Sequence, residues 1–146
     1  MKILILLENL TLNPADNYSV NELTMKKIHK WLDAGATVEY LTSINKFLEL
    51  KKIDDCFHDV LDLPDAKVHK KQETEKFKEV VEEINPGVFI DLKGSADGEK
   101  SISQQLGKSK IPVVELQSIE DVMRLPDYPE EIKKYIEDNE KVEEAE

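Results

Sequence analysis

The chain has 146 residues, enough for one domain with a hydrophobic core of its own. Its net charge of −11 argues against nucleic acid as a partner, because phosphate backbones are bound by clustered Lys and Arg. No stretch approaches the roughly 20 apolar residues of a membrane span, so neither a membrane partner nor a secretory leader is expected. A single cysteine, Cys56, excludes an internal disulfide and favours a reducing, cytoplasmic location.

The first half of the chain alternates strand and helix patterns. Residues 2–7 are apolar on both faces, which predicts a central strand of a parallel sheet covered by helices. Residues 19–22 match a capping box and predict the start of a helix, and Gly35 predicts its end. A strand at 37–41, a second helix over 47–57 and a short strand at 66–69 follow from the same patterns.

The second half continues the alternation. The apolar spacing at residues 77–84 predicts a helix, which Asn85-Pro86-Gly87 ends, and 88–92 predict the fourth strand. Further elements are a short helix at 101–106, a strand at 111–116, a helical turn at 119–123 and a helix from Pro129. Pro112 favours the start of a strand or the edge of the sheet. We therefore predict an α/β three-layer sandwich with a Rossmann-like parallel sheet of about five strands.

Polar side chains follow several of these strands, and they are the candidate site residues. In open α/β sheets, ligands bind beyond the carboxyl ends of the strands. Carboxylate and amide oxygens there can bind Mg²⁺, and hydroxyl groups can bind phosphate or cap the next helix. The candidates are Glu8, Asn9 and Thr11 after the first strand, Thr42 and Ser43 after the second, and Asp91 and Lys93 around the end of the fourth.

Other polar patterns give weaker indications of a binding site. The loop with Gly94 and Gly98 differs from a P-loop, because only three residues separate the glycines and Glu99 precedes the lysine. His29 is expected on the surface of the first helix. His69 ends the third predicted strand, either as an exposed strand end or, with Lys70, facing a phosphate group.

The strand ends, taken together, resemble the motifs of the haloacid dehalogenase-like (HAD-like) superfamily. Residues 7–12, Leu-Glu-Asn-Leu-Thr-Leu, resemble its first motif, D-x-D-G-T-L. Residues 40–43, Tyr-Leu-Thr-Ser, resemble its second motif, and 88–91, Val-Phe-Ile-Asp, resemble the strand of its acidic motif. The resemblance implies HAD-like topology. The length predicts a single domain, over residues 1–137, and residues 138–146 are predicted to form an acidic tail. It also implies a phosphorylated small molecule as ligand.

The departures from the first motif bear directly on catalysis. The alignment places Leu7 at the nucleophilic aspartate and Asn9 at the acid/base aspartate. Leucine has no oxygen to attack phosphorus, and an asparagine amide cannot shuttle a proton. An alignment shifted by one residue places Glu8 at the nucleophile instead, one methylene longer than aspartate.

The expected function is therefore a non-catalytic ligand- or partner-binding domain, with no cofactor or only weakly bound Mg²⁺. The alternative is a magnesium-dependent phosphohydrolase that uses Glu8, Asn9, Thr42 and Asp91 in altered roles. The loop at residues 9–18 is too short for a cap domain, and capless relatives need a cover for the site. A homo-oligomer is expected on that ground.

Overall fold

The structure is a computed structural model of the chain. It describes residues 1–63, 65–72, 76–93, 106 and 110–144, and the side chains of residues 139–144 are left out of the description. The predicted short helix at 101–106 falls almost entirely outside these residues.

Five parallel strands form the central sheet, and this confirms the predicted α/β fold. Their order across the sheet is β5-β4-β1-β6-β7. The chain fills the sheet outward from β1 in one direction and then crosses back to β6, so the topological switch point lies between β1 and β6. The strands are β1 (Lys2–Leu6), β4 (Thr37–Thr42), β5 (Lys67–Lys70), β6 (Val88–Leu92) and β7 (Val113–Leu116).

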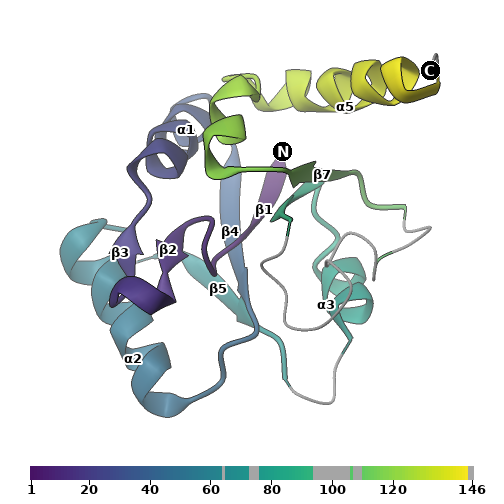
Figure 1. Cartoon of the computed structure of the whole chain (residues 1–146). Helices are drawn as coiled ribbons and strands as arrows, with labels where there is room; N and C mark the ends of the chain where they lie inside the picture. Colours follow the sequence, from purple (N-terminus) through teal and green to yellow (C-terminus); the bar gives the residue numbers. More distant parts are fainter. Residues whose placement is uncertain (64, 73–75, 94–105, 107–109, 145–146) are drawn as a thin grey trace.

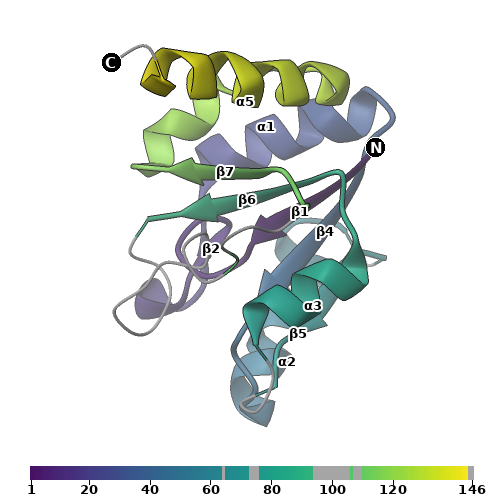
Figure 2. The ribbon, with the colours of Figure 1, turned by 90° about the vertical axis from the view of Figure 1, so that its right-hand side faces the viewer.

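Helices cover both faces of the sheet, as predicted. Figure 1 shows α1 and α2 on one side of the sheet and α3 on the other. In Figure 2, the long helix α5 lies beyond the edge formed by β7. The helical elements are α1 (Glu22–Asp33), α2 (Phe47–Asp55), the π-helical turn η2 (Cys56–Val60), α3 (Phe77–Ile84), the 3-10 segment η3 (Ile119–Arg124) and α5 (Pro129–Glu144).

The core is centred on β1. Every residue from Ile3 to Leu7 is fully buried, because β1 is the middle strand and has helices over both faces. Ile5 pairs in register with Tyr40 on one side and with Ile90 on the other. The apolar run at the start of the sequence is thus the covered central strand that it predicts.

The chain between β1 and α1 differs from the prediction. Strands β2 (Leu12–Asn13) and β3 (Ser19–Val20) form a hairpin around the 3-10 turn η1 (Pro14–Asp16). The expected capping box at residues 19–22 is wrong, because Ser19 is paired with Asn13 in this hairpin. Asn21 is the N-cap of α1, and its side-chain amide donates a hydrogen bond to the Leu10 carbonyl at 3.0 Å instead of capping the helix.

Two further predictions concern the ends of elements. β7 begins directly after Pro112 and is an edge strand, as the proline predicts. α5 begins at Pro129 and continues to Glu144, so most of the predicted acidic tail belongs to this helix. Among the helices that the structure describes, none is both long enough and apolar enough to cross a membrane.

Candidate functional site

The candidate site lies at the carboxyl edge of the sheet, next to the switch point. β1 lies between β4 and β6, so the residues that end these three strands are neighbours. Leu7 and Glu8 follow β1, Thr42 closes β4, and Asp91 is the last residue but one of β6. Fold geometry therefore gathers the predicted residues at one edge, but it does not bring all of them into contact.

A tight turn directly follows β1. The backbone N–H groups of Thr11 and Leu12 both donate to the Leu7 carbonyl, at 3.1 and 3.0 Å. Asn9 takes a left-handed conformation, with φ of 66°, and its N–H donates to the Leu12 carbonyl at 2.7 Å. The fully buried Thr11 hydroxyl donates to the Leu6 carbonyl at 2.9 Å, so it holds the turn against the strand.

The Glu8 carboxylate is the centre of the polar contacts at this edge. The Thr42 hydroxyl donates to Glu8 Oε1. The Ser43 backbone N–H and hydroxyl lie 3.5 and 3.4 Å from Oε2. Thr42 Oγ1 also accepts a 3.0 Å hydrogen bond from the Ile44 N–H. Glu8 is only 9% exposed, so donors that could hold a phosphate oxygen are turned toward a carboxylate of the chain itself.

Asp91 belongs to the other face of the sheet. Ile90 is level with Ile5, which is level with Tyr40, so these three side chains share one face. Side chains alternate along a strand, which places Thr42 on the face of Tyr40 and Asp91 on the opposite face. Asp91 is fully buried, and its Oδ1 accepts a 2.8 Å hydrogen bond from the Leu92 N–H. Asp91 and Thr42 therefore share an edge but not a face.

Exposed lysines lie at or after the carboxyl ends of three strands, β4, β5 and β6. Lys70 ends β5, Lys46 precedes α2, and Lys93 follows β6, and all three are exposed. The Lys71 N–H donates to the Thr42 carbonyl at 2.8 Å, which holds the loop after β5 against the end of β4. The exposed Lys46, Lys70 and Lys93, called the basic rim below, form a positively charged border in an acidic protein.

His69 lies near the end of β5, as predicted, but its side chain is half-buried and paired with a carboxylate instead of being fully exposed. Its Nε2 lies 2.6 Å from Glu39 Oε1, and Lys2 Nζ lies 3.8 Å from Glu39 Oε2. The register pairs His69 with Leu41, which puts its ring on the same face as Glu39, two residues earlier on β4. His69 therefore faces Glu39 and belongs to a partly buried polar group with Glu39 and Lys2. His29 is exposed on α1, as predicted.

The β2–β3 hairpin contributes a contact that the sequence does not reveal. The Tyr18 hydroxyl donates to Glu49 Oε2 on α2, and this hydrogen bond lowers the pKa of the Glu49 carboxyl. Burial and the same contact raise the pKa of Tyr18. Tyr18 has a positive φ of 59° in the turn of the hairpin, and no sequence pattern predicts this conformation. The hairpin is thus attached to α2 beside the candidate site.

The side chains that the structure describes at this edge fit a magnesium ion poorly. Mg²⁺ needs carboxylate oxygens that converge on one point. Here Glu8 faces hydroxyl and N–H donors, and Asp91 is on the other face of the sheet. Within the described residues, no group of three or more His, Cys, Asp or Glu side chains is placed to hold a metal ion.

Comparison with known proteins adds no relative. Neither models of protein families nor curated proteins nor solved structures give a significant match to the chain.

Proposed function

We propose that this chain is a non-catalytic HAD-like domain that binds a phosphorylated small molecule at the carboxyl edge of its sheet. The observation that carries the proposal is the environment of Leu7. It follows β1 where the resembling motif has its nucleophile, it has no oxygen, and it is fully buried. The strand order, with the first strand central and the order reversing beside it, is in keeping with the Rossmann-type topology that the resemblance implies.

The placement of the Glu8 carboxylate argues against phosphoryl transfer. A nucleophile must reach the phosphorus atom with a lone pair, and a displacement of about 1 Å can cost on the order of 100-fold in rate. Glu8 is nearly buried, and its two oxygens are directed at Thr42 and Ser43. Its charge also repels an anion that approaches these same donors.

The basic rim supports an anionic ligand. Lys70 ends β5, and Lys46 and Lys93 lie in the loops after β4 and β6, so a phosphate group outside Glu8 can reach lysine ammonium groups from both sides of β1. The start of α2 adds an exposed apolar surface beside Lys46, where Phe47 is 79% and Leu48 is 70% exposed. A phosphorylated molecule with an apolar part can contact both the basic rim and this apolar surface.

The alternative is a magnesium-dependent phosphohydrolase in which Glu8 takes the catalytic role. The observation in its favour is the contact of Glu8 with Thr42, since it puts a carboxylate and a hydroxyl together at the switch point. The two proposals predict opposite effects of the same substitution, and one variant therefore separates them.

Glu8→Gln is that variant, and the probes are inorganic phosphate and p-nitrophenyl phosphate. Under the binding proposal, removing the charge strengthens phosphate binding about fourfold, because one repulsive unit charge near 5 Å in water costs about 0.8 kcal/mol. Binding is followed by backbone amide shifts in NMR, at Ser43, Lys70 and Lys93. Wild type and variant hydrolyse p-nitrophenyl phosphate no faster than buffer, with or without Mg²⁺.

Matched lysine variants test the basic rim. Lys93→Gln weakens phosphate binding about fourfold, by the same Coulomb term. Lys133→Gln, an exposed lysine on α5, leaves phosphate binding unchanged. Added salt weakens the binding of phosphate, because exposed charges are screened. Magnesium-dependent hydrolysis that Glu8→Gln abolishes overturns the binding proposal in favour of the enzyme.

A further inference from the structure

A cavity lies at the opposite edge of the sheet from the candidate site. Its volume is about 410 Å³, within the range of sites for small organic molecules. It opens where β4 begins, whereas the candidate site lies where β4 ends, roughly 16 Å away at 3.3 Å per residue. Its lining comes from the end of α1 (Leu32), the start of β4 (Ala36, Thr37, Val38, Tyr40) and the turn before β5 (Asp62, Leu63, Asp65, Ala66).

Tyr40 is the most buried residue of the cavity lining. Tyr40 is 1% exposed, and its ring packs on Phe57 with centroids 4.8 Å apart. No residue that the structure describes makes a hydrogen bond with the Tyr40 hydroxyl. Its oxygen atom keeps some contact with solvent. Tyr40 is one of the residues that line the cavity, so its hydroxyl is a candidate hydrogen-bond partner for a bound molecule. Burial raises the pKa of Tyr40, so the group stays a neutral donor near neutral pH.

Two carboxylates belong to the lining of the cavity. Asp62 and Asp65 are exposed lining residues, and the described lining includes no lysine or arginine. Hydrogen bonds within the turn fix its shape: the Leu63 N–H donates to the Phe57 carbonyl at 2.8 Å and the Ala66 N–H to the Leu63 carbonyl at 3.1 Å. The lining therefore offers two exposed carboxylates, several apolar side chains and one largely buried hydroxyl group.

We propose that this cavity is a second binding site, for a small organic cation with an apolar body and a polar group at its far end. The ammonium group faces Asp62 and Asp65, the apolar body fills the space between Leu32 and Leu63, and the polar end bonds the Tyr40 hydroxyl. The site differs from the proposed phosphate site in the sign of its ligand's charge and in its place on the sheet. Failure of either proposal leaves the other untouched.

Tyramine is the probe, titrated into the full chain and followed by backbone amide shifts. It has an ammonium group, an aromatic body and a distal hydroxyl. We expect saturable shifts at Val38, Leu63 and Ala66 with a dissociation constant in the millimolar range, as suits a ligand of about ten heavy atoms. Phenethylamine, which lacks the hydroxyl, binds about fivefold more weakly, and the anionic 4-hydroxyphenylacetate more weakly still.

Three variants test the assigned contacts. Tyr40→Phe keeps the packing on Phe57 and removes the difference between tyramine and phenethylamine. The double variant Asp62→Asn, Asp65→Asn weakens tyramine binding roughly tenfold, and asparagine tolerates the positive φ of 53° at position 62. Asp59→Asn makes the same kind of charge change on η2, outside the lining, and shifts the affinity less than twofold.

Three outcomes overturn the proposal. One is equal affinity for tyramine and 4-hydroxyphenylacetate. Another is a set of shifts confined to Thr42, Ser43 and Lys93 at the other edge. The third is the absence of any saturable shift at the cavity residues up to about 20 mM probe, beyond the range that such a ligand needs.

Discussion

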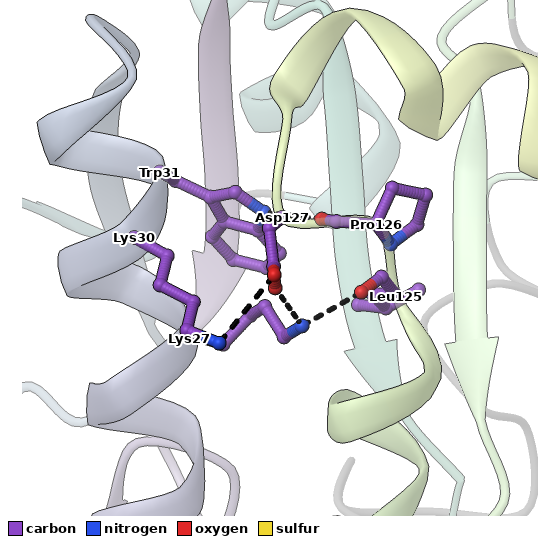
Figure 3. A network of polar contacts seen from close by, with 6 residues as sticks. All are labelled: Lys27, Lys30, Trp31, Leu125, Pro126 and Asp127. Atoms are coloured by element: carbon purple, nitrogen blue, oxygen red, sulfur yellow. Dashed lines mark hydrogen bonds and ion pairs between the residues drawn. The ribbon is translucent and has the colours of Figure 1, made fainter.

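Lys27 Nζ lies 2.6 Å from Asp127 Oδ1, although the two residues are 100 positions apart in the chain. The same ammonium group donates to the Leu125 carbonyl at 2.7 Å, and Trp31 Nε1 donates to the Pro126 carbonyl at 2.9 Å. Figure 3 shows these contacts between α1 and the segment that joins η3 to α5. With its side chain only 3% exposed, Lys27 is a buried charge that these two partners compensate.

Lys27→Met tests how much this connection stabilises the fold. Methionine keeps the apolar stem, but the Leu125 carbonyl loses its donor, so we expect the free energy of unfolding to fall by about 1–2 kcal/mol. Urea denaturation followed by Trp31 fluorescence measures it.

The neighbouring Lys30 is the matched control. It is 52% exposed and lies 3.4 Å from Asp127 Oδ2, so Lys30→Met changes stability by less than about 0.5 kcal/mol. Asp127→Ala costs more than Lys27→Met, because it leaves the buried ammonium without a carboxylate. Equal losses for Lys27→Met and Lys30→Met contradict this interpretation.

The pH dependence of stability provides a second test of the same contact. The hydrogen bond from Lys27 is the largest cause that lowers the pKa of Asp127. The ionised form is thus favoured in the folded state, and the stabilisation is complete above the unfolded pKa of about 3.9. It disappears as the pH falls through the lower folded pKa. The difference in unfolding free energy between wild type and Asp127→Asn is expected to be constant from pH 5 to 7 and to shrink toward pH 2.

Much of the fold follows from the sequence, because its main elements carry strong local patterns. The apolar run of β1 and the helical spacing at residues 77–84 predict elements that the structure contains at the same places. The β2–β3 hairpin was missed, because its strands have two residues each. Its turn places Asn17 and Tyr18 at positive φ without a glycine to mark it.

The sequence predicts the candidate site only as a set of polar residues at the ends of neighbouring strands. Spacing along the chain puts Glu8, Thr42 and Asp91 at one edge of a parallel sheet. Which of them touch depends on register and on the turn after β1, and neither is encoded in a local pattern. The structure joins Glu8 to Thr42, and the alternation of β6 directs Asp91 to the other face.

Gly35 allows a test of a backbone conformation that the sequence indicates. It follows α1 with φ of 92°, and its N–H donates to the Leu32 carbonyl at 3.0 Å. No atom lies within 4 Å of an added Cβ, so the cost of Gly35→Ala is conformational and amounts to about 1 kcal/mol. Gly35→Asn costs less, since asparagine adopts positive φ more readily. Equal thermal stability of all three proteins contradicts this account.

Thr24 allows a test of a buried polar group that lacks a hydrogen-bond partner among the described residues. Its fully buried Oγ1 on α1 makes no hydrogen bond within the described residues. Thr24→Val keeps the shape and removes the unpaired hydroxyl, so we expect stability to stay the same or to rise by up to about 1 kcal/mol. Chemical denaturation measures the change, with Thr11→Val as the control. That control removes the hydrogen bond to the Leu6 carbonyl and costs about 1 kcal/mol. A loss at Thr24 as large as that at Thr11 contradicts the assignment.

The buried Cys56 of η2 makes the free energy of unfolding depend on pH in the alkaline range. Its thiol is 8% exposed, and burial raises its pKa. The folded state therefore holds the thiol proton more tightly than the unfolded chain, whose cysteine titrates near pH 8.5. The resulting stabilisation is complete below that pH and is lost as the pH rises through the folded pKa. We expect Cys56→Ala to lose less stability than wild type between pH 8 and pH 10, in parallel urea denaturations. In the folded wild type, the thiol reacts with a disulfide reagent at pH 8 far more slowly than in urea. Rapid labelling of the folded protein contradicts the burial of the thiol.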